Sequence, residues 1–355
     1  MKKHIDFIDV AKGLAIIAVV MSHAITNSTD SFSVSHPVLL NWISLFNVPV
    51  FFFINGFLYN ESYSKTPIKS IIKKAKAYYI PYVSYNLFFL LTYNISIDMH
   101  LLNSSASKLN AKTFFLELLR VLCSKLESFG GPLWFLRALI VVTTLYILVD
   151  SLSSQLFNGQ FRYLINAIFA VFLYLLNYFG YASHTFNINA GCSAMIVFFA
   201  GVMFKHINLA ELTQKYAIPL SCITFMITII IANTSYVGIV KHLNPALDIF
   251  AKITSIIMVI CISQIPSFTG FAPLKKLGQS SMEIMALHIL AFKPVSLLII
   301  YLYKLDISML ADNPVVKSAL VTITWSIVYT TFGLLLPYLL FYCKAYCKNN
   351  LKQQK

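Results

Sequence analysis

Charged residues are scarce in this chain of 355 residues: they make up 11% of it, with 13 Asp and Glu against 27 Lys and Arg. Hydrophobic residues make up 58%, and the mean hydropathy is +0.74. This composition excludes an ordinary soluble domain. Tryptophan is rare too, with 3 residues, whereas 29 Phe and 20 Tyr suit helices with tyrosines at the membrane interfaces better than an alternating barrel pattern. We therefore expect an all-α, polytopic membrane bundle.

Several functional signals are also missing. The six cysteines suggest no disulfide framework, and no His, Cys, Asp or Glu spacing suggests a metal site, so no metal is expected. There is no glycine-rich phosphate loop. The net charge of +14 is accompanied by no nucleic-acid motif, so nucleic acid is not an expected partner. No convincing cleavage site follows the first apolar run, which is interpreted as a retained span.

Apolar windows of about 20 residues mark the expected membrane helices. They lie near 7–26, 38–60, 77–95, 133–151, 160–180, 190–205, 216–234, 247–265, 279–303 and 318–343. Lys293-Pro294 is expected to kink the ninth. The sequence thus predicts about ten transmembrane helices in one domain, 1–355, with no appended extracytoplasmic domain.

The distribution of lysine and arginine predicts the orientation. One side carries Lys2, Lys3, Lys65, Lys69, Lys73, Lys74, Lys76, Arg162, Lys205, Lys215, Lys275, Lys276, Lys344, Lys348, Lys352 and Lys355. The other side carries only Lys108, Lys112, Arg120, Lys125, Lys241, Lys304 and Lys317. Because basic residues accumulate on cytoplasmic loops, both termini are expected in the cytoplasm and residues 96–132 outside.

The first expected helix carries ionisable residues at both ends. Lys12 and His23 are 11 residues apart, so they share a helix face at a separation of about 16 Å along the axis. Asp9 falls on nearly the same face. Ionisable groups within membrane spans are candidates for function, although Asp9 and Lys12 as an interfacial pair and His23 as a polar helix contact are the structural alternative.

Four segments resemble the acyltransferase-3 family of integral-membrane acyltransferases. "IDFIDVAKGLAIIAVVMSHA" is similar to its opening signature, and "NVPVFFFINGFLY" to its second-helix motif. "GGPLWFLRALIVV" resembles the fucose 4-O-acetylase-like branch, and "SSMEIMALHIL" matches the penultimate span. The chain has Lys12 where family members usually have arginine, and Asn55 where they have serine. A lysine run replaces the arginine pair before helix three, and lysine lacks arginine's bidentate fork.

The resemblance implies transfer of an acetyl group from cytoplasmic acetyl-CoA to a hydroxyl of a cell-surface carbohydrate or its lipid-linked precursor. His23 would act as general base or accept the acetyl group itself. Trp134 and Arg137 are candidates for stabilising the oxyanion, although Arg137 could also snorkel to the interface. The residues expected to bind the cofactor are Asp9, Lys12, Asn55, Lys73, Lys74 and Lys76. The lysine patch has an alternative role as a topology signal that touches anionic lipid.

Further polar residues lie in later spans. Glu283 and His288, five residues apart, do not share a helix face. His288 falls on a family motif position, with helix packing as the alternative, and Asp248 and Lys252 form an i,i+4 pair interpreted as structural. A secondary transporter or flippase is the alternative function, since a helical bundle with a broken ninth helix suits alternating access. No internal repeat supports it. The expected location is a bacterial cytoplasmic or inner membrane.

Overall fold

The computed structural model describes residues 5–26, 37–102, 106–123, 128–234, 244–312, 314–315 and 323–353. Every regular element in these ranges is a helix, which confirms the all-α prediction. Of the residues used to predict the orientation, Lys2, Lys3, Lys125, Lys241, Lys317 and Lys355 lie outside the described ranges.

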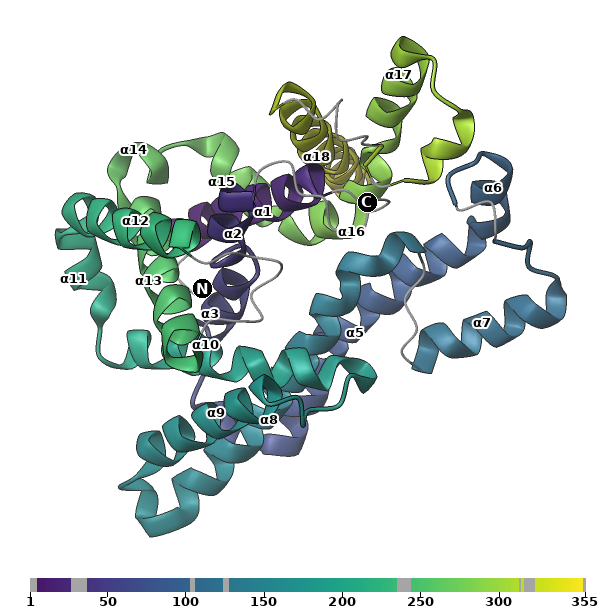
Figure 1. Ribbon diagram of the computed structural model, residues 1–355. Helices are drawn as coiled ribbons and strands as arrows, with labels where there is room; N and C mark the ends of the chain where they lie inside the picture. The colour runs from purple at the N-terminus through teal and green to yellow at the C-terminus, as the bar shows by residue number, and fades with distance from the viewer. Residues whose placement is uncertain are drawn as a thin grey trace.

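The first half of the described chain folds into α1 (Asp6–Ile25), α2 (Pro37–Ser44), α3 (Pro49–Phe57), α4 (Ser62–Lys65), α5 (Pro67–Leu91), α6 (Tyr93–Asp98), α7 (Ala111–Cys123), η1 (Ser128–Leu133), α8 (Trp134–Gln155), η2 (Leu156–Gly159) and α9 (Arg162–Tyr178). The second half folds into η3 (Thr185–Asn187), α10 (Ile188–His206), α11 (Leu209–Lys215), α12 (Ala217–Thr234), α13 (Pro245–Gln264), α14 (Pro266–Thr269), α15 (Ala272–Gln279), α16 (Ser281–Ala291), α17 (Lys293–Tyr303), η4 (Ile307–Ala311) and α18 (Ile323–Gln353). Figure 1 shows their arrangement.

Six helical stretches among the described residues are long and apolar enough to cross a membrane. They are Asp6–Ile25, Val38–Phe57, Phe129–Gln155, Thr185–His206, Pro245–Gln264 and Ser281–Tyr303. The pair Leu209–Lys215 and Ala217–Asn233, bent by 93°, would make a seventh, and Arg162–Tyr178 and Thr324–Leu340 are shorter apolar helices. The chain is therefore a multi-helix membrane protein, and the count of ten spans stays a prediction.

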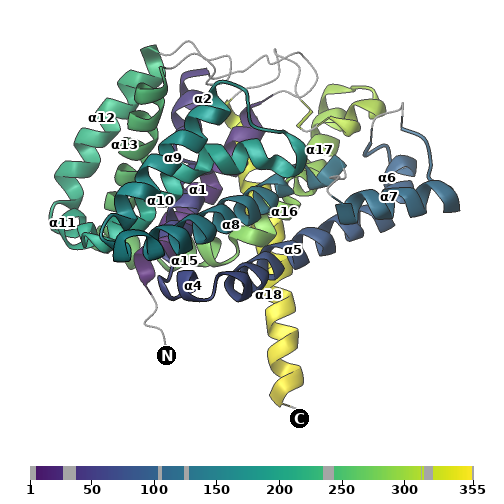
Figure 2. The same cartoon turned by 90° about the horizontal axis from the view of Figure 1, so that it is seen from below.

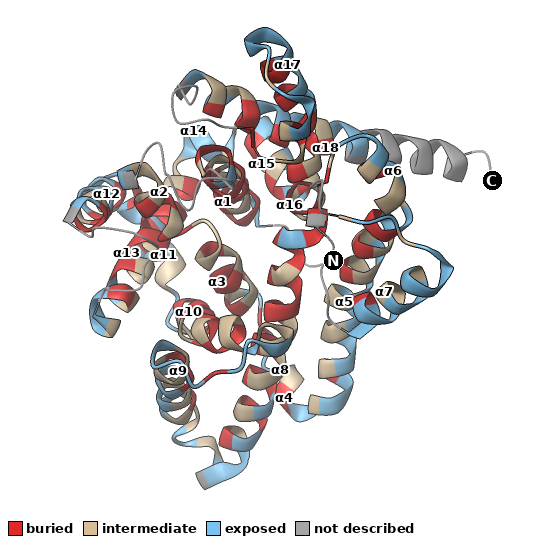
Figure 3. Ribbon diagram, turned by 45° about the vertical axis from the view of Figure 1, so that its right-hand side comes forward, coloured by how far each residue is buried: buried red, intermediate tan, exposed pale blue. Residues whose placement is uncertain are grey.

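Helix α1 lies inside the bundle, where it packs against α13, α15, α16 and α18. Its buried faces and the exposed outer faces of α9, α12 and α17 are visible in Figure 3. The contact with α15 depends on glycine: a Cβ added at Gly278 would lie 1.8 Å from the carbonyl oxygen of Asp9, and one at Gly13 would lie 2.3 Å from that of Leu274. The two helices thus touch backbone to backbone, which fixes the height of Asp9 and Lys12.

The outer helices present large apolar side chains to their surroundings. Ile168 on α9, Ile218 and Met226 on α12, and Leu340 on α18 are each about 60% exposed. A water-soluble protein seldom leaves contiguous apolar surface of this kind uncovered. These faces are suited to lipid contact.

A buried ionic network joins α8 and α9 to the end of α3. Asp150 is 1% exposed and accepts hydrogen bonds from Arg162 Nε and Nη2, both at 2.7 Å. The same carboxylate accepts from the Tyr59 hydroxyl at 2.8 Å and from Asn166 Nδ2 at 2.9 Å. Because the charge is paired bidentately and both oxygens are bonded, its burial is compensated.

The described chain has two distinguishable ends along the bundle. Helix α1 begins and α18 ends on one side, where α4 and α15 also lie (Figure 2). Helix α2 and the ends of α12 and α13 that border residues 235–243 lie on the opposite side (Figure 2). His23, near the last turn of α1, belongs to this second side. If the orientation predicted from the lysines holds, this second side faces outward.

Candidate active site

Two histidines from distant parts of the chain meet at the end of α1. The ring centroids of His23 on α1 and His288 on α16 are 5.1 Å apart, with the ring planes at 41°. His288 is fully buried, whereas His23 is exposed between the buried residues Ser22 and Ala24. The exposed His23 imidazole therefore borders accessible space, and the buried His288 ring packs against it.

Backbone contacts fix the ring of His288. Its Nδ1 lies 3.0 Å from the carbonyl oxygens of both Ile284 and Met285. A ring nitrogen facing two acceptors carries the hydrogen, so Nδ1–H is the assigned tautomer. Its Nε2 is then an acceptor, and it has no hydrogen-bond partner within the described ranges. Phe292 packs edge-on against the ring at 5.8 Å, so His288 presents a fixed and neutral face to His23.

The other end of α1 carries the predicted acid and base. Asp9 is buried and accepts a hydrogen bond from Gln279 Nε2 of α15 at 2.7 Å. Lys12 Nζ lies 3.9 Å from Asp9 Oδ1, at the outer limit of an ion pair, and its side chain is 28% exposed. Asp9 thus takes part in the packing of α1 against α15, while the Lys12 ammonium can still bind another anion.

Asn55 and the lysine run are linked through α5. The Tyr78 hydroxyl donates to Asn55 Oδ1 at 2.8 Å. One turn earlier on α5, Lys74 Nζ lies 5.2 Å from the centre of the Tyr63 ring. Lys73 and Lys76 are exposed. Asn55 of α3 thus contacts Tyr78 of α5, and Lys74 of α5 faces Tyr63 of α4, whereas the side chains of Lys73 and Lys76 are exposed.

Arg137 and Trp134 lie in the first turn of α8. The Arg137 guanidinium is buried between two rings, 5.7 Å from the centre of Tyr82 and 5.9 Å from that of Phe186. Both rings lie within the range of a cation–π contact, so the guanidinium packs against side chains of α5 and η3. Trp134 is half-buried and packs edge-on against Phe135 at 6.4 Å.

The segment that covers Arg137 has an unusual backbone. Phe186 and Asn187 adopt left-handed conformations, with φ of 52° and 56°. This conformation is uncommon for non-glycine residues, and for a bulky aromatic it carries strain. The surrounding fold sets the Phe186 ring over the guanidinium.

Sequence reasoning found most ionisable members of this arrangement but missed their neutral partners. Gln279 and Tyr78, which orient Asp9 and Asn55, lie in other helices and follow no local motif. Glu283 is half-buried and lies near Tyr85 of α5, whereas His288 turns toward His23. The separate directions of Glu283 and His288 agree with their predicted angular separation.

Comparison with protein families matches residues 5–344 to the acyltransferase-3 family, described as an acyltransferase domain. No curated protein and no solved structure matches the chain. The matched range takes in all four segments that resemble the family, from the signature on α1 to the motif with His288. The fucose 4-O-acetylase-like branch stays a prediction.

Proposed function

Because the chain belongs to the acyltransferase-3 family of membrane acyltransferases, we propose that it transfers an acetyl group from cytoplasmic acetyl-CoA to a hydroxyl of a cell-surface carbohydrate or its lipid-linked precursor. The observation that carries the proposal is the contact between His23 and His288 at 5.1 Å. This contact brings together the two family motifs that contain a histidine. It lies at the end of α1 opposite to Lys12.

The length of α1 separates cofactor binding from chemistry. Lys12 offers a partly exposed ammonium at one end, and His23 an accessible imidazole about 16 Å further along the helix. The CoA phosphates would lie near Lys12 and Lys74, and the uncharged pantetheine arm would follow α1 past Asn55. The thioester carbonyl would then reach the level of His23.

In the proposed step His23 acts as the base. Its neutral imidazole nitrogen takes the proton of the acceptor hydroxyl while that oxygen bonds to the thioester carbonyl carbon. The C–S bond then breaks, and the CoA thiolate leaves and takes up the proton. Alternatively, the acetyl group passes first to the His23 ring and then to the hydroxyl. His288, fixed by two backbone carbonyls, keeps the His23 ring in position in either route.

Labelled acetyl-CoA and purified protein test the proposal. His23→Ala should lower acetyl transfer by about 10²-fold or more, since that is the usual contribution of a general base, while acetyl-CoA affinity stays unchanged. His100→Asn is the matched control, because His100 is exposed and adopts a positive φ of 55° that asparagine tolerates. Activity of His23→Ala within a few-fold of the parent would contradict both mechanisms.

A further inference from the structure

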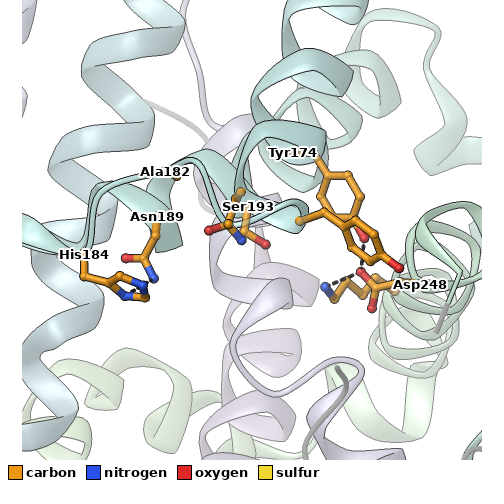
Figure 4. A pocket seen from close by; sticks show the side chains of 10 residues that line it. Tyr174, Ala182, His184, Asn189, Ser193 and Asp248 are labelled. Atoms are coloured by element: carbon orange, nitrogen blue, oxygen red, sulfur yellow. Dashed lines mark hydrogen bonds and ion pairs between the residues drawn. The ribbon is translucent and has the colours of Figure 1, made fainter. Parts of the chain in front are cut away.

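A cavity of about 550 Å³ lies where the end of α9, the connection 180–184, the start of α10 and the start of α13 come together. Its size falls within the range of small-molecule sites, roughly 300–1,000 Å³. His184 and Asn189 lie at one end of it and Tyr174 and Asp248 at the other, with Ser193 between them (Figure 4). Because α13 begins on the side where α1 ends (Figure 2), the cavity shares that side with His23.

Two residues that line the cavity carry a buried acceptor oxygen without a donor in the described part of the chain. Asp248 is 4% exposed, and its Oδ2 accepts from Lys252 Nζ at 2.6 Å and from the Tyr174 hydroxyl. Its Oδ1 has no hydrogen-bond partner within the described residues, and neither has Asn189 Oδ1. Leaving a buried acceptor without a donor is unfavourable, so two such oxygens on residues that line one cavity favour a ligand that brings donors.

The lining favours a neutral ligand rich in hydroxyl groups. Lys252 is already paired with Asp248, which leaves little net charge to attract an anion. The rings of Tyr174 and Tyr178 are stacked at 6.5 Å and 26° and offer an apolar wall at the Asp248 end of the cavity. A sugar combines hydroxyl donors with apolar C–H faces, whereas an acyl chain would leave both acceptors unsatisfied.

A second, smaller cavity adjoins this site. It has a volume of about 160 Å³, shares Ser193 and Lys252 with the first, and is also lined by Trp134 and Val48. Val48 follows Asn47, whose Nδ2 lies 3.4 Å from Ser22 Oγ. Ser22 precedes His23, so Val48 in the lining of the smaller cavity is linked to α1, next to the histidine pair, through Asn47 and Ser22.

We infer that the larger cavity binds a sugar unit of the acceptor, with Asp248 Oδ1 and Asn189 Oδ1 accepting hydrogen bonds from its hydroxyls. The smaller cavity, lined by Trp134, extends this site along the starts of α3 and α8. This assignment rests on the proposed function, since it names where that reaction's acceptor is held. It also gives the Asp248–Lys252 pair a role beyond the structural one expected from its spacing.

Direct binding tests the assignment, with oligosaccharides released by mild acid from the envelope polysaccharide of the cells that carry the gene as the probe. Asp248→Asn and Asn189→Ala should each weaken the dissociation constant at least tenfold. Acetyl-CoA affinity reports whether each variant is folded. Asp306→Asn is the matched control, because Asp306 caps η4 away from the cavity.

A third variant fills the space that the two cavities share, and it does so after folding is complete. Ser193→Cys, treated with benzyl methanethiosulfonate, should lose oligosaccharide binding, while the parent with its native cysteines, treated in the same way, should keep it. Unchanged binding in all three variants, or no binding by the parent, would overturn the assignment. Binding that depends on these residues without any acetyl transfer from acetyl-CoA would instead refute the proposed function and leave the sugar site standing.

Discussion

His288 contributes no proton donor toward the reaction in the proposed mechanism, because its Nδ1 is engaged by the carbonyls of Ile284 and Met285. Its effect is to support the ring of His23 through direct contact. His288→Ala should therefore lower kcat about tenfold or more, while KM for acetyl-CoA changes little; the melting midpoint also falls, because the truncation leaves a cavity at a fully buried position.

His288→Phe separates ring packing from the backbone hydrogen bonds that fix the ring, since phenylalanine fills similar space but has no Nδ1–H to donate. A parent-like kcat in His288→Phe would mean that only ring packing matters. A loss of stability parallel to the loss of kcat in both variants would contradict a positioning role.

Lys12 is expected to act on the cofactor and not on the chemistry. Its ammonium is partly exposed and only loosely paired with Asp9 at 3.9 Å, so Lys12→Ala removes a charge that can bind a phosphate. A hydrogen bond to a charged group contributes about 1.5–3 kcal/mol, which corresponds to at least about tenfold in the dissociation constant of acetyl-CoA. Lys12→Arg keeps the charge and should restore binding. Equal loss in both variants, or a change in kcat alone, would argue against cofactor contact.

At the scale of helices, the backbone contact between α1 and α15 positions the end of α1 that carries Asp9 and Lys12. Gly278→Ala would place a Cβ 1.8 Å from the Asp9 carbonyl oxygen, and overpacking of this kind costs about 1–3 kcal/mol. We expect a lower melting midpoint and weaker acetyl-CoA binding, because the Gln279–Asp9 hydrogen bond depends on the same contact. Gly131→Ala is the control, since nothing lies within 4 Å of its added Cβ. Identical behaviour of the two variants would show that the contact is dispensable.

The first half of α5 is expected to contribute long-range attraction for the CoA phosphates. Replacing Lys73, Lys74 and Lys76 by Gln should weaken acetyl-CoA binding about tenfold at low salt, and the difference from the parent should narrow as salt increases, because exposed charges are screened over about 10 Å at 0.1 M. Replacing Lys108, Lys112 and Arg120 by Gln removes the same number of charges near α7. A dissociation constant that the first triple variant leaves unchanged would make the lysine run a topology signal only.

At the scale of the whole molecule, periodicity and hydropathy predicted well those features that are encoded along a single helix. The stripe of Lys12 and His23 follows from the helix repeat alone. The expected span 77–95 begins ten residues late, since α5 starts at Pro67 and its lysine-rich first turns are not apolar. The expected span 38–60 corresponds to the candidate span Val38–Phe57, in which a turn separates α2 from α3. The meeting of His23 with His288 and the cavity around Asp248 depend on packing between distant helices, for which the sequence carries no local pattern.

The orientation of the whole molecule governs every functional statement about its two ends. Helix α1 begins and α18 ends on one side of the bundle (Figure 2), as expected if both termini lie in one compartment. The surplus of lysine on that side predicts the cytoplasm.

Single cysteines at Ser105 and Gln353, in a background without the native six, test this with an impermeant thiol reagent on intact cells. Ser105→Cys should react at once, and Gln353→Cys only after the membrane is permeabilised. The opposite pattern would place Lys12 outside and His23 inside, away from a cytoplasmic CoA donor and an external sugar acceptor, and acetyl transfer across the membrane in the proposed direction could not stand.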